Sequence, residues 1–188
     1  MNLIIFGPPG AGKGTQSNFI VKKHNLFQIS TGKILREEIT NKSELGQKIS
    51  KLMSSGSLVQ DEIVNKLIEN IVSDQNHKYR FIFDGYPRNL NQAKFLDSLL
   101  TSHKQKIDMV FKLSVSLETI KRRILERRSI EKRSDDNEET AVKRYKTYEA
   151  ATEPVIEYYK KLNLLKVIDG ERSIDQITKE ISDIINLI

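Results

Sequence analysis

The sequence predicts an α/β domain in which a parallel sheet is covered by helices on both faces. Short apolar runs recur along the chain and are separated by stretches with helical periodicity, a pattern typical of parallel strands buried on both sides. At the start of the chain, a strand, a glycine-rich loop and a helix follow one another directly. The length of 188 residues suits one such domain with small inserted lobes.

The first half of the chain alternates strands and helices from its third residue. Ser30 or Thr31 is expected to cap the helix that follows the second strand, and Asp61 is a candidate N-cap for a later one. In chain order, we expect strands at residues 3–6, 27–29 and 81–84, and helices ending near residue 24 and at about 33–40, 43–55, 61–73 and 91–101.

The second half continues the pattern with two strands and three helices. Residues 128–136, R-S-I-E-K-R-S-D-D, are polar and lack periodicity, which predicts a mobile connection. The long helix after it should bend at Pro154, which cannot donate to the carbonyl of Ala150. Ser173 and Gln176 form a capping box for the final helix. The expected strands are at 107–113 and 164–168, and the expected helices at about 116–127, 137–162 and beyond 173.

The glycine loop reads G-P-P-G-A-G-K-G-T and carries one lysine, Lys13. Glycines let the backbone wrap closely around an anion, with successive N–H groups pointing inward, and the helix N-terminus adds partial positive charge. The loop differs from the strict P-loop pattern because Gly14 follows the lysine, with Thr15 one position later. It predicts binding of a nucleoside triphosphate, with Lys13 on the outer phosphates.

Composition favours a cytoplasmic enzyme that is not bound to a membrane. No apolar run approaches the roughly 20 residues needed to span a bilayer, and the chain enters a strand at once, so no signal peptide is expected. The chain has no cysteine, which excludes a disulfide framework and a thiolate zinc site.

The net charge of +6 would suit nucleic acid, anionic lipid or phosphorylated small molecules. Arg36, Arg88, Arg133 and Arg172 stand singly at the ends of predicted elements, which indicates a pocket for several phosphates. The one dense basic run, 121–128, contains no aromatic residue for stacking on bases. We interpret it mainly as the solvated face of an amphipathic helix and expect no nucleic-acid partner.

Polar residues follow the apolar runs at Ser30, Asp84 and Asp169. Because the carboxyl ends of parallel strands meet at one edge of the sheet, a binding site is expected there. A carboxylate that ends a buried strand beside a P-loop commonly holds Mg²⁺, directly or through its waters. We expect Asp84 to act in this way, through water and with Thr15 nearby; the alternative is that it caps the turn into Gly85.

Five motifs, in order and over essentially the whole length, resemble those of nucleoside monophosphate kinases. They are GPPGAGKGTQ, ISTGKILREE, GSLV, FDGYPRNLNQA and the arginine-bearing stretch 127–144 with DDNEET. Within that family the chain is similar to adenylate kinases of the short-lid type. The resemblance implies one domain over residues 1–188, with a five-stranded parallel P-loop core, a monophosphate-binding lobe at 30–59 and a lid at 126–136. It also implies a monomer that uses Mg²⁺ to transfer a phosphoryl group reversibly from ATP to AMP, giving two ADP.

The resemblance also assigns site residues. The ATP contacts it implies are Gly10, Ala11, Gly12, Lys13, Gly14, Thr15, Arg127 and Arg172. The implied AMP contacts are Thr31, Arg36, Ser57, Leu58, Val59, Gly85, Tyr86, Pro87, Arg88, Gln92, Arg133 and Arg144. Catalysis is expected of Lys13, Arg88, Arg127, Arg133 and Arg144.

The chemistry of such a transfer agrees with these residue types. The attacking phosphate oxygen of AMP is already ionised, so no general base is needed, whereas cations must bring two polyanions together. Arginine suits this task because its planar fork holds two phosphate oxygens at once. The segment around Arg133 is expected to close as a lid that excludes water. Longer relatives sometimes clamp their lid with zinc through cysteines; a short lid without zinc is expected here.

Two alternatives remain. Thr31 and Gln92 fit an adenine reader, since a side-chain amide both donates and accepts, but related UMP/CMP kinases share the other motifs. A P-loop GTPase switch or nucleic-acid-binding ATPase is the alternative from another class. A switch GTPase would need an N-K-x-D guanine reader, and the nearest string, at 41–44, has glutamate in place of the aspartate.

Overall fold

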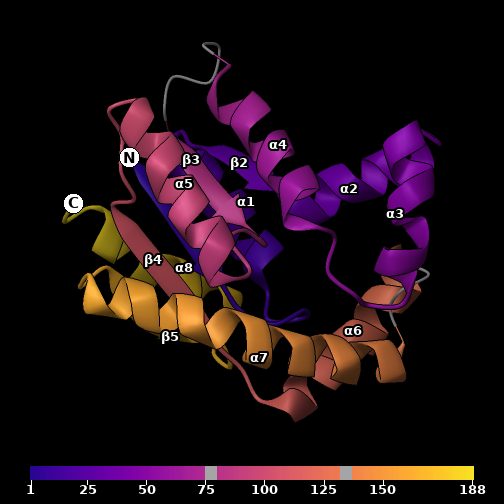
Figure 1. Ribbon diagram of the computed structural model, residues 1–188. Coiled ribbons are helices and arrows are strands. Elements are labelled where there is room, and N and C mark those ends of the chain that lie inside the picture. The colour runs from indigo at the N-terminus through magenta and orange to yellow at the C-terminus, as the bar shows by residue number, and fades with distance from the viewer. Residues whose placement is uncertain (75–79, 132–136) are drawn as a thin grey trace.

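The fold is a five-stranded parallel sheet with helices on both sides (Figure 1). The computed structural model describes residues 1–74, 80–131 and 137–188. The strands run in the order β2-β3-β1-β4-β5, and each neighbouring pair is parallel. Their bounds are β1 Asn2–Phe6, β2 Phe27–Ser30, β3 Phe81–Asp84, β4 Met109–Ser114 and β5 Leu165–Asp169. The predicted α/β fold class is confirmed.

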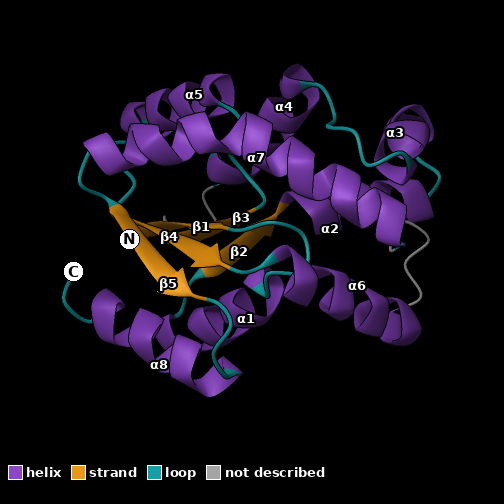
Figure 2. Cartoon of the chain, turned by 90° about the horizontal axis from the view of Figure 1, so that it is seen from below, coloured by secondary structure: helices purple, strands orange, loops and turns teal. Residues whose placement is uncertain are grey.

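The sheet is the middle of three layers (Figure 2). Successive strand residues point to opposite faces. Ile4 and Phe6 of β1 therefore pack into the core with α4, α5 and α7, whereas Leu3 and Ile5 pack with α1 and α8. Burial on both faces explains why the strands read as continuous apolar runs. These helices are α1 Lys13–His24, α4 Asp61–Val72, α5 Leu90–Ser102, α7 Glu138–Lys161 and α8 Ile174–Ile185.

Three helical segments extend past the carboxyl ends of the strands, on the side away from both termini (Figure 1). They are α2 Thr31–Thr40, α3 Glu44–Ser54 and α6 Leu117–Glu131. Helices α2 and α3 pack on each other, and α6 packs on α7. No helix in the described ranges is both long and apolar enough to cross a bilayer.

The predicted cap at Asp61 is wrong. Gln60 occupies the N-cap position of α4, and Asp61 is the first residue of the helix. Its carboxylate accepts hydrogen bonds from the side chains of Asn89 and Gln92. The sequence predicted that this carboxylate would cap its own helix, but it instead accepts hydrogen bonds from the cap and the first turn of α5.

Ser30 stands at the cap position of α2, as predicted, but its side chain makes no cap bond. The strand continues through Ser30, which pairs with Asp84, and the hydroxyl donates to Asp84 Oδ2 at 3.2 Å. Helix α2 consequently begins at Thr31, whose hydroxyl donates to the carbonyl of Gly85 at 2.8 Å.

The connection predicted to begin at residue 128 begins later, because α6 continues to Glu131. Its last turn contains no glycine or proline, and arginine and glutamate are good helix formers. Residues 132–136 lie outside the described residues. Helix α7 runs through Pro154 without a break, so the bend there stays a prediction, and the capping box of Ser173 and Gln176 is confirmed.

A close helix contact in the fold depends on Gly46 of α3. A Cβ built on it would lie 2.1 Å from the carbonyl oxygen of Glu38 in α2. We expect Gly46→Ala to lower the free energy of unfolding by about 1–3 kcal/mol, although alanine is the better helix former. Denaturant unfolding measures this. Gln47→Ala, at an exposed neighbour, should stay within about 0.5 kcal/mol of the parent; a stabilised Gly46→Ala would contradict the contact.

Candidate functional site

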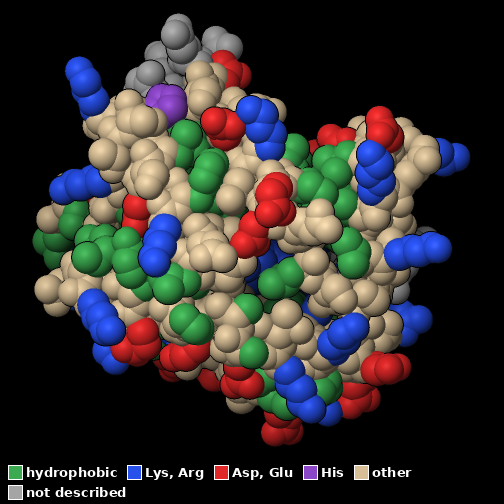
Figure 3. Space-filling model, in the orientation of Figure 1, with side chains coloured by type: hydrophobic (Ala, Val, Ile, Leu, Met, Phe, Trp, Pro, Cys, Tyr) green, Lys and Arg blue, Asp and Glu red, His purple; other side chains and the backbone are tan. Residues whose placement is uncertain are grey.

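A cavity of about 900 Å³ opens at the carboxyl ends of β1, β2 and β3. Its walls come from the P-loop, α2, residues 56–59, the loop after β3, α6 and α7. The space-filling view shows a hollow between α2 and α7, and Lys or Arg side chains lie at its bottom (Figure 3). All predicted site residues within the described ranges line this cavity, except Tyr86.

The P-loop forms one wall and presents the start of α1. Gly12 is the N-cap residue with φ 92°, a conformation that favours glycine. No side chain caps this helix start, and its first turn contains no acidic residue. Its partial positive charge and first N–H groups are thus available to an anion. The Lys13 ammonium donates to the carbonyl oxygens of Gly7 at 2.7 Å and Pro8 at 3.1 Å, which folds the side chain over the loop.

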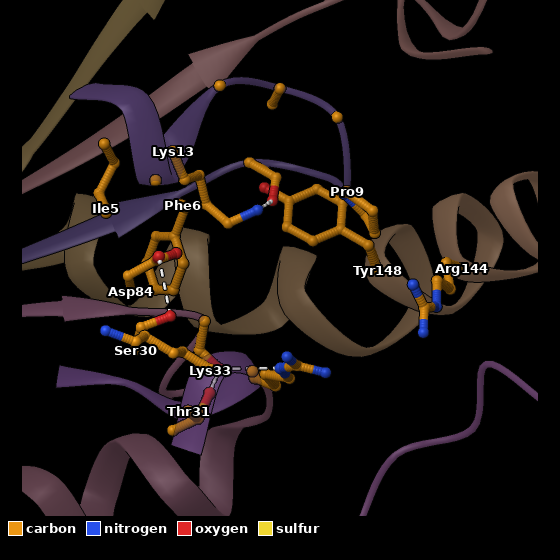
Figure 4. Close-up of a pocket in the computed structure, with 18 of the residues that line it drawn as sticks. Ile5, Phe6, Pro9, Lys13, Ser30, Thr31, Lys33, Asp84, Arg144 and Tyr148 are labelled. Atoms are coloured by element: carbon orange, nitrogen blue, oxygen red, sulfur yellow. Dashed lines mark hydrogen bonds between the residues drawn. The ribbon is translucent and has the colours of Figure 1, made fainter. Parts of the chain in front are cut away.

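Asp84 ends β3 and faces the same loop (Figure 4). The residue is 8% exposed, and its Oδ2 accepts from Ser30 Oγ and Gln28 Nε2, each at 3.2 Å. A Cβ on Gly14 would lie 4.0 Å from Oδ2, so the missing side chain there leaves room before the carboxylate. A single carboxylate with adjacent space fits Mg²⁺, which keeps several waters and takes few protein ligands. In the described residues, no three His, Cys, Asp or Glu side chains gather as a metal cage.

Arginines from three separate elements meet at the cavity: Arg36 of α2, Arg88 after β3 and Arg144 of α7. Burial lowers the pKa of Arg88, and the charges of Arg144 and Arg36 lower it further, against the opposing effect of Asp84. Arg144 also donates to the carbonyl oxygen of Met53 in α3 at 3.2 Å. Like charges held together in a partly buried site favour the binding of a polyanion.

The carbonyl of Gly85 joins two predicted site residues. It accepts from Thr31 Oγ1 and from Arg88 Nε, both at 2.8 Å. Gly85 has φ 77°, and a Cβ there would lie 3.0 Å from Thr31 Oγ1. A side chain at this position would therefore disturb the contact that ties the loop to α2.

Of the predicted site residues Gln92 and Tyr86, only Gln92 contributes to the cavity wall. Gln92 lines the cavity although it is only 2% exposed; its Oε1 accepts from the Arg88 N–H and its Nε2 donates to Asp61, each at 2.7 Å. Tyr86 is fully buried, and its hydroxyl donates to Asn65 Oδ1 at 2.6 Å. The Tyr86 side chain belongs to the core and is not part of the cavity wall.

Sequence reasoning missed Arg123 and Tyr148, which both line the cavity. Each lies four residues from a predicted arginine on the same helix, Arg127 on α6 and Arg144 on α7, and residues at this spacing share a face. Arg123 donates to the carbonyl oxygen of Gly170 at 3.0 Å. The Tyr148 ring points from α7 toward the P-loop (Figure 4). Its hydroxyl is buried and has no hydrogen-bond partner among the described residues.

Two predicted arginines remain. Arg172 lines the cavity and pairs with Asp169 and Glu180. Arg133 lies outside the described residues, so its predicted role is not tested here.

Comparison with known proteins gives a consistent family. The family model for adenylate kinase matches residues 5–164. An adenylate kinase of Pelagibacter ubique is 44% identical, with 100% of both chains covered. Similar proteins from Fusobacterium nucleatum and Thermobifida fusca, also named adenylate kinase, are 42% identical over 98% of each chain and 40% identical over 95% of each.

The Tyr148 hydroxyl generates a stability prediction. Burial raises the pKa of Tyr148, so the group stays a protonated donor, and leaving a buried donor unpaired costs about 1–3 kcal/mol. In the absence of ligand, we expect Tyr148→Phe to raise the free energy of unfolding by up to about 1 kcal/mol.

The matched control is Tyr158→Phe. The Tyr158 hydroxyl donates to Asp97 Oδ2 at 2.6 Å, so its removal should destabilise the protein by about 1 kcal/mol or more. Denaturant unfolding of both variants measures the difference. An equal loss in the two would mean that the Tyr148 hydroxyl does have a partner in solution.

Proposed function

Since the chain belongs to the adenylate kinase family, we propose that it transfers a phosphoryl group reversibly from Mg·ATP to AMP, giving two ADP. The observation that carries this proposal is the shared cavity. A P-loop forms one wall, and three arginines from separate elements line the same cavity. Such an arrangement suits two phosphorylated substrates, one on each side. We further propose a cytoplasmic monomer that binds ATP, AMP and ADP.

The proposed mechanism needs positioning and charge, and no base. A phosphate oxygen of AMP attacks the γ-phosphorus of ATP in line, and the bond between this phosphorus and the β–γ bridging oxygen breaks. The P-loop N–H groups and Lys13 hold the donor phosphates. Arg36 and Arg88 hold the acceptor phosphate, and Arg144 reaches the group in transfer. These cations stabilise the charge that spreads over the transferring oxygens.

Asp84 is the proposed holder of Mg²⁺, through water and with Thr15 nearby. The bound ion would neutralise phosphate charge on ATP. We propose no zinc. The donor side is completed by Arg127 and, at the adenine end, Arg172.

We propose that the acceptor base lies between apolar walls and one amide. Leu35, Val59 and Val64 line the cavity and are 4–7% exposed, which suits a flat ring. Gln92 and Thr31 would supply the polar contacts, with Ser57 and Leu58 beside them. The same amide matches the amino group and ring nitrogen of cytosine, so CMP is the alternative acceptor that the site itself suggests.

Movement is also part of the proposal. Residues 30–59 would form the acceptor lobe and 126–136 a short lid, both within a single domain that spans 1–188. Closure of the lid, with Arg133 entering the site, would exclude water and so prevent hydrolysis of ATP.

An assay of ADP production tests this function directly. Mg·ATP is offered with AMP, CMP, UMP or GMP in parallel, with and without a chelator of divalent ions. We expect rapid turnover with AMP alone and its loss on chelation. Preference for CMP or UMP would overturn the base assignment, and no turnover with any acceptor would overturn the proposed reaction.

Single cations at the transferring phosphates should matter strongly. We expect Lys13→Ala and Arg88→Ala to keep the fold and to lower kcat by about a hundredfold or more, as for other lost transition-state donors. Steady-state kinetics and thermal unfolding measure both effects. Arg122→Ala is the control, since Arg122 is exposed and does not line the cavity. Normal turnover of Arg88→Ala would contradict the acceptor site.

A further inference from the structure

The amide of Gln92 is held between two groups of fixed polarity. The main-chain N–H of Arg88 can only donate, and it bonds to Oε1 at 2.7 Å. The carboxylate of Asp61 can only accept, and it receives a hydrogen from Nε2 at 2.7 Å. If the amide were reversed, oxygen would face the carboxylate and NH₂ would face the N–H group. The chemistry of the two partners therefore fixes which end of the amide is which.

Asp61 is itself fixed by a second amide. Asn89 Nδ2 donates to Oδ1 of Asp61 at 2.8 Å and to Oδ2 at 3.0 Å. Asn89 cannot reverse without loss, because its Oδ1 accepts the Gln92 N–H as the N-cap of α5. Asp61, at the start of α4, thus receives donors from the N-cap residue of α5 and from a residue in its first turn. It is not among the residues that line the cavity.

This arrangement leaves a defined pattern for a ligand. Oε1 of Gln92 keeps a second lone pair and Nε2 keeps a second hydrogen. Adenine offers an amino donor beside a ring-nitrogen acceptor, whereas a 6-oxopurine offers an oxygen acceptor beside an N–H donor. An amide fixed in one orientation therefore pairs with the adenine edge. In the same binding pose, it would place acceptor against acceptor and donor against donor at the edge of a 6-oxopurine.

We propose that Asp61 is a positioning residue that sets the base specificity of the acceptor site, favouring adenine over 6-oxopurines by fixing the Gln92 amide. The inference rests on the proposed function, in which Gln92 reads the acceptor base. Asp61 acts through Gln92 and touches no substrate. Without it, the amide keeps only the Arg88 N–H to define its orientation.

The test compares AMP with IMP, which carries an oxo group in place of the 6-amino group and a proton on N1. We expect Asp61→Ala to lower the ratio of kcat/KM for AMP to that for IMP about tenfold, the scale of one oriented hydrogen bond. Asp61→Asn keeps one acceptor oxygen and should retain more of this ratio. A parental ratio in both variants, with native folding shown by thermal unfolding, would overturn the proposal.

Asp175→Ala is the matched control. Asp175 is, like Asp61, an acidic residue in the first turn of its helix, here α8, but it is exposed and is not among the residues that line the cavity. Asp175→Ala should leave the ratio of kcat/KM for AMP to that for IMP unchanged. If the ratio falls as much as in Asp61→Ala, the effect comes from the general loss of a negative charge, and the proposal is refuted.

Gln92→Leu separates failure of the inference from failure of the proposed function. We expect this variant to lower the ratio, and Asp61→Ala to add nothing in its background, because the two residues act as one unit. If Gln92→Leu lowers the ratio and Asp61→Ala does not, only the role of Asp61 fails. If Gln92→Leu keeps the ratio, Gln92 does not read the base and both fail.

Discussion

The guanidinium of Arg88 lies at the carboxyl end of β3, where its burial and the positive charges of Arg144 and Arg36 lower its pKa. Cations repel one another, so the chain can gather them only where rigid elements hold their backbones in place. The sheet fixes the loop that carries Arg88, while α2 and α7 bring the other two. Contacts such as Arg144 to the Met53 carbonyl and Arg88 to the Gly85 carbonyl direct the side chains. The layers of the fold therefore serve to keep like charges facing one cavity.

Main-chain carbonyls and fixed amides order several side chains of this site. The Lys13 ammonium donates to two P-loop carbonyls, and the Gly85 carbonyl accepts from both Thr31 and Arg88. Neutral acceptors orient a cation without cancelling its charge. Gln92 and Asn89 extend the same principle to the side proposed for the acceptor base, since their amide orientations follow from partners that can only donate or only accept.

The sequence predicted the strands and the P-loop wall well, because continuous apolar runs and a glycine loop are local patterns. Almost all of the described site residues that the family-like motifs predicted do line the cavity. The motifs could not predict in which direction each side chain points. Tyr86 belongs to a motif, yet its side chain is buried in the core. Local rules likewise predicted that the side chains of Asp61 and Ser30 cap helices, whereas these side chains form hydrogen bonds with residues of other elements. Arg123 and Tyr148 were missed because helical spacing from Arg127 and Arg144 was not followed along α6 and α7.

The strand order has a consequence for how the chain is made. β1 is the central strand, and its partners are β3, beginning at Phe81, and β4, beginning at Met109. During synthesis the P-loop leaves the ribosome well before the two strands that hold it in the sheet. Pairings between segments so far apart in the sequence are slow to form. Arg144, on α7, is synthesised later still. A chain that ends before α7 thus carries the P-loop without the opposite walls of the cavity, and the cavity can assemble only after α7 has been made.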